Sequence, residues 1–381
     1  MRILPILLAA SPLLPGQGSE LLPRIREKMT GILLRQPDYT CTETVERARQ
    51  AVGSRERIED TLRLEVALVD GKEMFAWPGS KEFEDHDLSE LVSTGMFGNG
   101  NFAIYARILF LSNVAEFEDR GDTELDGRTA RRYDFRVPRG GSGSRLRNGK
   151  HEAVVGFHGS LYADPMTLDV RRMEVVAEDI PAELGITAAE TSVDYGRLPI
   201  GDERFLLPVE SRLMMAMPDE VNRNWVRFAN CRKFTGESTL LFNDPVLTET
   251  QAAPIAPQEV DIPAHLTLQL EMPGLDLIQA AVGDPVRAIL WADVKDHGRL
   301  LAPKGGIARG RIMQLDRYSN AFALRIEFKD LDWPGGHARL KLRFDQPAFT
   351  TRLIGRQGGD IVILRQAGTR LSGILMFWRS E

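Results

Sequence analysis

Residues 154–177 predict a long β-hairpin, and this stretch constrains the fold more than any other. Val154 to Ala163 is rich in β-branched and aromatic residues, and Leu168 to Ala177 resumes an extended pattern. Between them, Asp164-Pro165 has turn chemistry. Because an isolated hairpin is only marginally stable in water, both strands should belong to a larger antiparallel sheet with one apolar face.

The second strand of this hairpin changes the face on which its apolar residues fall. Leu168 and Val170 share one parity, whereas Met173 and Val175 share the other, so the switch lies near Arg171. One extra residue in the strand, a β-bulge, produces such a shift. A sheet that is buried on both faces explains the same pattern, and the sequence leaves both explanations open.

The first 18 residues have the layout of a secretory signal peptide. Arg2 precedes an apolar run from Ile3 to Leu14, and small residues follow up to Ser19. Prolines interrupt the run, which is also shorter than the roughly 20 apolar residues that span a bilayer. We therefore expect cleavage near Gly18 and a mature chain that is soluble and periplasmic, or otherwise extracytoplasmic.

The charge balance excludes some classes of partner. The chain has 48 Lys and Arg against 54 Asp and Glu, which gives a formal net charge of −6. Nucleic-acid binding draws on clustered basic residues, and no segment after the signal peptide is long and apolar enough to cross a membrane. We expect neither a nucleic-acid partner nor a transmembrane span in the mature chain.

Cys41 and Cys231 are the only two cysteines, and export would place them in an oxidising compartment. We predict a Cys41–Cys231 disulfide; the alternative is two buried free thiols. The bridge closes a loop of about 190 residues, for which the chain-entropy model gives about 5 kcal/mol as an upper value. The chain has no CxxC motif and no Cys/His spacing, which argues against redox catalysis and a zinc site.

Two stretches near the N-terminus have contrasting patterns. Residues 61–69 alternate strictly, with Leu62, Leu64 and Val66 on one face and charged residues on the other, which predicts a half-buried strand. Residues 102–111 are apolar around much of a helical circumference. This helix should therefore lie in a core or over a concave apolar sheet.

Two glycine-containing stretches are predicted as connections. Residues 95–101 should join two helices, because their spacing matches neither a Walker A sequence nor a dinucleotide-binding fingerprint. Residues 138–150, PRGGSGSRLRNGK, predict a mobile basic loop.

The sequences ELDGRTARRYDFRVP (Glu124 to Pro138) and GSLYADPMTLDVRRMEV (Gly159 to Val175) resemble the periplasmic lipoprotein-carrier superfamily, which includes LolA-like carriers and RseB-like stress sensors. The resemblance covers about residues 19–243. It implies a curved antiparallel half-barrel sheet whose concave apolar face is covered by helices and accommodates acyl chains. The residues expected to line this apolar cleft are Phe102, Ile104, Tyr105, Ile108, Leu109, Leu62, Leu64 and Val66.

A second domain is expected after a linker. Residues 244–263 are rich in proline and alanine with little periodicity, which predicts an extended linker. In residues 264–381 short alternating strands recur between glycine-containing turns, which predicts a small all-β sandwich or barrel. Residues 281–312 are weakly similar to β-barrel domains of type IV secretion outer-core proteins. The chain as a whole is therefore predicted to be mainly β, with an α+β first domain.

No catalytic constellation stands out in the sequence. His158-Gly159-Ser160 lacks the G-x-S-x-G elbow of hydrolases, and Asp85-His86-Asp87 fits a solvated loop before a helix. We expect no catalytic, cofactor or metal site. The sequence favours a non-enzymatic exported envelope protein that binds lipid, an acylated protein or a hydrophobic peptide. The alternative is an envelope sensor or assembly scaffold that contacts other envelope proteins through its C-terminal β domain.

Overall fold

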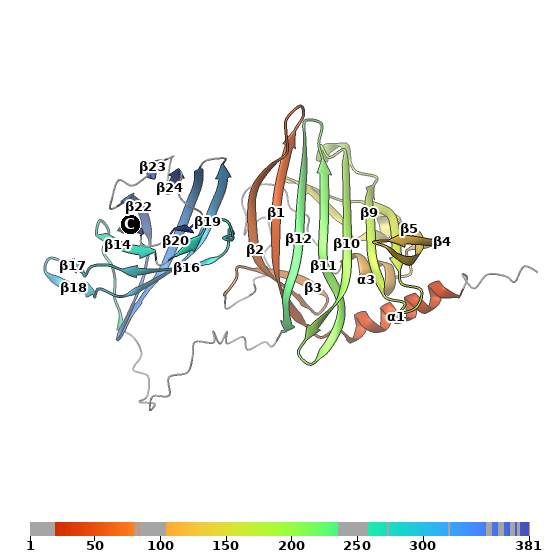
Figure 1. Ribbon diagram of the computed structural model, residues 1–381, viewed down its shortest axis with the longest axis horizontal. Helices are drawn as coiled ribbons and strands as arrows, with labels where there is room; N and C mark the ends of the chain where they lie inside the picture. The colour runs from red at the N-terminus through yellow and green to blue at the C-terminus, as the bar shows by residue number, and fades with distance from the viewer. Residues whose placement is uncertain are drawn as a thin grey trace, which may run out of the picture.

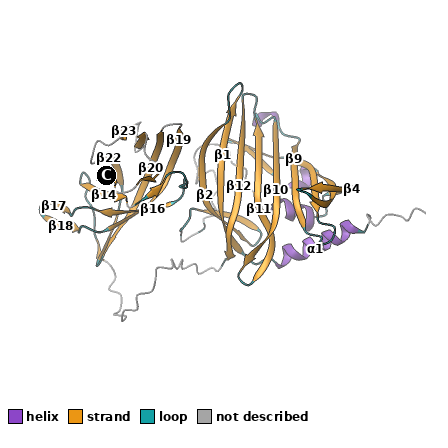
Figure 2. Ribbon diagram, viewed as in Figure 1, coloured by secondary structure: helices purple, strands orange, loops and turns teal. Residues whose placement is uncertain are grey.

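The structure is a computed structural model, and it describes residues 20–80, 83, 104–234, 258–272, 274–318, 321–347, 353–356, 362–365, 370–371 and 374–380. Strands dominate and form two ten-stranded sheets, one in each domain (Figures 1 and 2). This confirms a mainly β fold. None of the described helices is long and apolar enough to cross a membrane. The predicted signal peptide, the glycine-rich stretch 95–101 and most of the predicted linker lie outside the described residues.

The first sheet is antiparallel and has the order β3-β2-β1-β12-β11-β10-β9-β8-β5-β4. Except for β1 beside β12 and β5 beside β8, neighbouring strands follow one another along the chain, and the sheet curls into the predicted half-barrel (Figure 1). Its strands are β1 (Tyr39–Ala51), β2 (Arg57–Val69), β3 (Lys72–Ala76), β4 (Glu116–Leu125), β5 (Arg128–Val137), β8 (Gly156–Ala163), β9 (Val170–Glu178), β10 (Ala188–Ile200), β11 (Glu203–Ala216) and β12 (Glu220–Lys233).

Two helices, α1 (Leu21–Arg35) and α3 (Ile104–Leu111), pack on one face of this sheet, which we call the inner face. Helix α1 contributes one apolar stripe, because Ile25, Met29 and Ile32 recur at helical spacing and are buried. The helix ends before Pro37, which cannot continue it. The apolar positions of α1 thus fix which side of the sheet becomes the core.

The predicted hairpin is present as β8 and β9. The Asp164 carboxylate accepts hydrogen bonds from the backbone N–H groups of Met166 and Thr167, at 2.9 and 2.8 Å, which closes the turn. Tyr162 pairs with Arg172 while the next residue, Ala163, pairs with Val170, so Arg171 is an extra residue in β9. The face switch in the sequence is therefore a β-bulge.

The prediction of a mobile loop over residues 138–150 was wrong. This stretch forms the short helix α4 (Arg139–Ser142) and strand β6 (Arg145–Asn148), which pairs with β7 (His151–Val154). Gly149 supplies the left-handed turn between them, with a φ of 59°. The arginines that gave the stretch its basic character bind Glu152 on the partner strand, with Arg145 Nη1 2.7 Å from its carboxylate.

The second sheet has the order β13-β21-β20-β19-β16-β14-β26-β22, and β24 pairs with both β20 and β23. Residues 258–259, within the predicted linker, form β13 and pair with β21. A second core surrounds Trp378, whose ring meets Phe328 and Phe344 edge-on at centroid distances of 5.2 and 5.4 Å. The strands of the sheet are β13 (Gln258–Glu259), β14 (Thr267–Met272), β16 (Pro285–Leu290), β19 (Ile307–Tyr318), β20 (Ala321–Trp333), β21 (Gly336–Arg339), β22 (Leu342–Pro347), β23 (Leu353–Arg356), β24 (Val362–Arg365) and β26 (Ile374–Ser380).

Short elements complete the described structure. Two further antiparallel pairs lie beside the second sheet, and a 3-10 turn follows β9 in the first domain. These elements are β15 (Leu275–Asp276) with β25 (Arg370–Leu371), β17 (Val294–Asp296) with β18 (Arg299–Ala302), and η1 (Ala182–Leu184).

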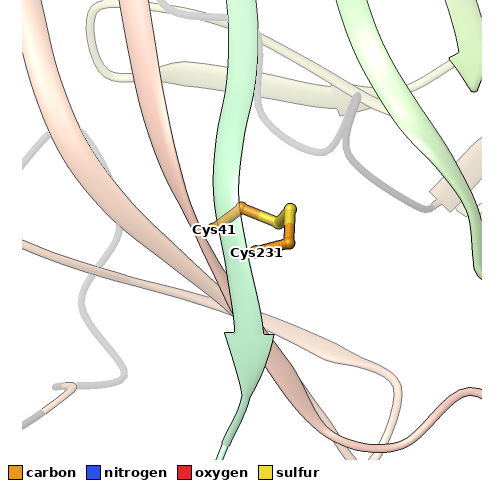
Figure 3. Close-up of a disulfide and its surroundings, with 2 residues drawn as sticks. All are labelled: Cys41 and Cys231. Carbon is orange, nitrogen blue, oxygen red and sulfur yellow. A yellow bond between two sulfur atoms is a disulfide. The ribbon is translucent and has the colours of Figure 1, made fainter. Parts of the chain in front are cut away.

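The predicted disulfide is present and joins Cys41 on β1 to Cys231 on β12 (Figure 3). The two strands are neighbours in the sheet, and their register shifts between Thr40 and Thr42, so that Cys41 sits in the irregularity. The bridge therefore links the first strand of this sheet along the chain, β1, to the last one along the chain, β12, and the two lie side by side in the sheet.

The second domain docks against the edge of β2. Leu62 and Val282 form a β-bridge: the Arg63 N–H donates to the Val282 carbonyl and the Val282 N–H donates to the Thr61 carbonyl, both at 2.8 Å. Residues of both domains consequently belong to one continuous apolar cluster. The charged face of β2, which the alternation predicted to be solvated, instead faces another part of the same chain.

Side chains reinforce this junction. Arg63 donates to the Asp284 carboxylate at 2.6 Å, and Arg311 donates to the Pro78 carbonyl at 2.9 Å. Gly283 has a φ of 100°, and a Cβ on it would lie 2.3 Å from the Arg63 carbonyl oxygen. Only glycine allows this close approach of the two backbones.

Candidate functional site

The inner face of the first sheet carries two buried groups of side chains with different chemistry. Residues that are paired directly across antiparallel strands share a face, so the strand register assigns each group. We call the first group the apolar half: Tyr133, Phe135, Phe157, Leu161, Met173 and Val175. We call the second group the polar half: Glu43, Arg47, Asp60, Ser211, Asn222 and Asn224.

Helix α3 covers the apolar half. Leu109 and Phe110 are buried against the sheet, and the rings of Tyr105 and Phe157 meet edge-on at a centroid distance of 5.4 Å. Thr30 on α1 donates to the Phe110 carbonyl at 3.0 Å, which ties the two helices together. The helix therefore occupies a specific position over the sheet.

Tyr105 also gives α3 a polar contact with the sheet. Burial raises the pKa of the Tyr105 hydroxyl, although its side-chain hydrogen bonds with Thr191 and Ser144 act in the opposite direction. Burial likewise raises the pKa of Tyr195, which interacts electrostatically with Tyr105. Both phenols therefore stay neutral at ordinary pH.

Glu43 is the most unusual residue of the polar half. It lies opposite Leu64 on β2 and Phe228 on β12, its exposed fraction is 8%, and its Oε2 has no hydrogen-bond partner among the described residues. Burial, assisted by the nearby Glu73 carboxylate, raises the pKa of Glu43 to about 8. At neutral pH most of this carboxyl is therefore protonated and able to donate a hydrogen bond.

Arg47 and Asp60 show how a buried charge is satisfied on the same face. They are direct cross-strand partners, and the guanidinium binds the carboxylate through both Nε and Nη2, with a distance of 2.6 Å from Nε to Oδ1. Both residues are at least nine-tenths buried. Their charges cancel within the pair, whereas Glu43 has no such partner among the residues that the structure describes.

The predicted cleft residues fall into two separate buried clusters. Ile104, Tyr105, Ile108 and Leu109 lie on α3, and the last three belong to or pack against the cluster of the apolar half. Leu62, Leu64 and Val66 on β2 are fully buried in the other cluster, which continues into the second domain. Phe102 lies outside the described residues, so a single cleft lined by all eight stays a prediction.

Sequence reasoning missed the polar half, although one signal for it was present. Positions 41, 43, 45 and 47 share one face of β1, and two of them are charged. Cys41 was expected to be buried in a disulfide. Charged residues on the same face of the strand therefore indicated that charges would be buried beside it. Their partners, such as Asp60 and Asn224, come from other strands and are found only in the folded chain.

His158 and Ser160 do not act on one another in this structure. Ser160 Oγ donates to the Asp134 carboxylate at 2.9 Å, whereas His158 Nδ1 lies 2.8 Å from the Glu178 carboxylate. Both side chains project from the side of β8 opposite Phe157, away from the apolar half. Among the described residues no group of three or more His, Cys, Asp or Glu is placed to hold a metal ion. Asp85-His86-Asp87 lies outside the described residues.

The other face of the same sheet carries a shallow pocket of about 380 Å³. It lies over β9 to β12 and mixes carboxylates and guanidinium groups with one indole ring. The side chains that give it this character are Glu174, Glu190, Ser192, Arg212, Arg223 and Trp225. Its open, charge-balanced lining contrasts with the buried inner face.

No family model matches this chain, and no curated protein matches it. Ten solved chains are similar to it, among them the following three. A DUF1329 family protein from Desulfovibrio piger is 11% identical, with a TM-score of 0.30, over 56% of this chain and 92% of that one. LolA superfamily protein NE2245 from Nitrosomonas europaea is 12% identical, with a TM-score of 0.28, over 56% and 93% of the two chains.

The third structure is a domain of a putative outer membrane lipoprotein-sorting protein from Vibrio parahaemolyticus. It is 11% identical, with a TM-score of 0.31, over 58% of this chain and 93% of that one. The structural neighbours thus include the superfamily that the first domain resembles. At these identities and scores the likeness transfers no function to this chain.

Proposed function

We propose that this chain is a non-enzymatic, exported envelope protein whose first domain binds a ligand with an apolar chain, such as a lipid or an acylated protein. The observation that carries the proposal is helix α3 over the apolar half of the inner face. This helix has eight residues, too few to be stable alone. It is nevertheless apolar almost all round, with Tyr105, Ile108 and Leu111 only partly buried.

An acyl chain can occupy the same kind of surface as this helix. Helix α3 is held by side-chain packing and a few hydrogen bonds, such as Thr30 to the Phe110 carbonyl. A displaced α3 would uncover Phe157 and Leu161, and an acyl chain would bury them again at about 0.8 kcal/mol per methylene. Glu43, protonated at neutral pH, is suited to hydrogen-bond an ester or amide carbonyl of such a ligand.

Export is supported by the disulfide. The Cys41–Cys231 bridge is the type of bond that persists in oxidising compartments and is rare in the reducing cytosol. A thiol titration of denatured, unreduced protein should find no reactive thiols if the chain matures outside the cytosol. Two reactive thiols would contradict the proposed compartment.

The binding function is tested by displacement of a fluorescent fatty acid and by lipid extraction from the purified chain. We expect saturable binding that Ile108→Asp, on the partly buried side of α3, weakens about tenfold or more. Met166→Asp at the exposed β8–β9 turn is the matched control and should bind as the wild type does. No co-purifying lipid together with no displacement would contradict the proposal.

The alternative function is an envelope sensor or assembly scaffold that acts through the second domain. It is favoured by large apolar side chains that are exposed there, among them Trp291 and Leu300. Crosslinking in intact cells distinguishes the two functions, because a scaffold should yield a stable protein partner and a pure carrier should not.

A further inference from the structure

Exposed apolar side chains gather on one part of the second domain. Ten large apolar side chains are exposed in the described part of the chain, and four of them lie between residues 289 and 307. They are Ile289, Trp291, Leu300 and Ile307, with exposed fractions of 41, 46, 50 and 39%. Exposed apolar residues that are scattered singly need no explanation, whereas a group of them marks an interaction surface.

The strand register places most of this group side by side. Ile289 on β16 lies directly opposite Ile307 on β19, so both side chains project from the same face. Trp291 follows two residues beyond Ile289, and the Lys304 ammonium lies 4.9 Å from the centroid of its ring. We call Ile289, Trp291, Lys304 and Ile307 the Trp291 patch.

The same face continues from the Trp291 patch to the junction with the first domain. Arg287 and Arg309 form the next cross-strand pair, and Pro285 and Arg311 form the pair after that. Arg311 reaches the first domain through the Pro78 carbonyl. The first domain thus contacts one end of this face and leaves the Trp291 patch exposed at the other end.

The charge on this side of the sheet is mainly positive. Cross-strand pairing assigns to it the arginines Arg287, Arg309, Arg311, Arg325, Arg339, Arg343 and Arg379, and the carboxylates Glu271, Asp316, Glu327, Asp330 and Asp332. Asp332 is already bound by Arg309 at 3.2 Å and by His337 at 2.8 Å. Residues 258–381 as a whole have 17 Lys and Arg against 14 Asp and Glu, although the entire chain is acidic.

We propose that the Trp291 patch, with its flanking arginines, docks the second domain on the surface of an anionic lipid bilayer. Tryptophan and branched apolar side chains favour the membrane interface, and neighbouring Lys and Arg side chains reach anionic headgroups. This docking uses a different domain from the proposed ligand site. The docking proposal can therefore be confirmed or refuted whether or not the first domain binds a ligand.

The size of the patch favours a bilayer over a second copy of the chain. Four side chains that are about half exposed offer on the order of 400 Å² of surface. Each partner in a stable protein complex contributes roughly 800 Å², so the patch alone is too small for one. Membrane binding needs less area, since apolar insertion and attraction to anionic lipids act together.

The experiment measures binding of the full chain to vesicles. Vesicles of phosphatidylcholine and phosphatidylglycerol should bind the wild type, whereas vesicles of phosphatidylcholine alone should bind it several-fold more weakly. High salt should weaken the binding, because it screens the arginines. The triple variant Ile289→Ser, Trp291→Ser, Ile307→Ser should lose about tenfold or more in affinity for the anionic vesicles.

Matched controls come from the first domain. Val52→Ser and Met166→Ser alter side chains that are even more exposed, and Arg128→Glu reverses an exposed charge; all should bind vesicles as the wild type does. Arg287→Glu should bind anionic vesicles several-fold more weakly. Quenching of the wild-type tryptophan fluorescence by nitroxide lipids should be reduced in Trp291→Phe, a variant that keeps an aromatic ring at this position.

Three results would overturn the proposal. They are no binding of the wild type to anionic vesicles, equal binding by the triple variant, and nitroxide quenching that Trp291→Phe leaves unchanged. Sedimentation without vesicles tests the other occupants. A self-association that the triple variant abolishes would assign the patch to a second copy. If the chain binds no vesicles but binds an acidic protein in a manner that the triple variant abolishes, the patch would be assigned to a protein partner.

Discussion

In the apolar half of the inner face, Phe157 and Leu161 are buried among other apolar side chains. In the polar half of the same sheet, Arg47 and Asp60 are buried against each other and Glu43 has no hydrogen-bond partner for its Oε2 among the described residues. The first arrangement is stabilised mainly by packing, whereas the second depends on the match between individual charges. Because the polar half buries titratable side chains, we expect its stability to depend on pH more than that of the apolar half.

The largest effect should follow from breaking the apolar half. Phe157→Ala removes a fully buried ring that contacts Tyr105 and Phe135, and should lower the free energy of unfolding by about 4 kcal/mol. Chemical denaturation followed by circular dichroism measures the loss. Met166→Ala, at a side chain that is 88% exposed, is the control and should change stability very little. A similar loss in both variants would mean that the ring is not part of a packed core.

Breaking the polar half should cost somewhat less. Asp60→Ala leaves the Arg47 guanidinium buried without its carboxylate and should lower the free energy of unfolding by about 3 kcal/mol. The double variant Arg47→Met, Asp60→Leu removes both charges and should recover most of this loss. The same denaturation experiment compares the two, and a double variant as unstable as the single one would contradict the charge argument.

Glu43→Gln should alter how stability depends on pH. The carboxyl titrates near 4.5 in the unfolded chain and at about 8 in the folded one. Below pH 4.5 both states hold the proton, so Glu43 costs nothing there; between these values only the unfolded state releases it, and stability falls as the pH rises. By pH 6, about 1.5 units above the unfolded value, the wild type should already have lost about 2 kcal/mol relative to Glu43→Gln. Parallel stability curves for the two proteins between pH 5 and about 8 would contradict the buried position of this carboxyl.

The smallest effect is expected on the opposite side of the sheet. Ser160→Ala removes the hydrogen bond to Asp134 and should cost about 1 kcal/mol of stability. Fatty-acid binding should be unchanged, because this side chain faces away from the inner face. A loss of binding without a loss of stability would show that Ser160 has a role beyond structure.

Local patterns in the sequence predicted much of the fold. The change of parity near Arg171 marked a β-bulge, and the Asp164-Pro165 turn set the register of the hairpin around it. Both features depend on residues close together in the chain. The Cys41–Cys231 pairing was predictable for a different reason, since two cysteines allow only one intramolecular bridge.

Other features that depend on distant residues were not predicted. Alternation in β2 showed that Arg63 would lie on a polar face, but Asp284, which receives its guanidinium, is more than 200 residues away. The basic stretch 138–150 resembled a loop because Glu152, the partner of its arginines, lies beyond it. The same limit applies to the candidate site, because Glu43 is buried by neighbouring strands that come together only in the folded chain.

The pairing of Val282 with the edge of β2 has a consequence for solubility. Unpaired strand edges can pair with other chains, and β2 is long and apolar on one face. The second domain occupies this edge beside Leu62 and holds it with the Arg63–Asp284 salt bridge. Separating the two domains would leave the first domain with an exposed edge, and we expect it to aggregate where the whole chain does not.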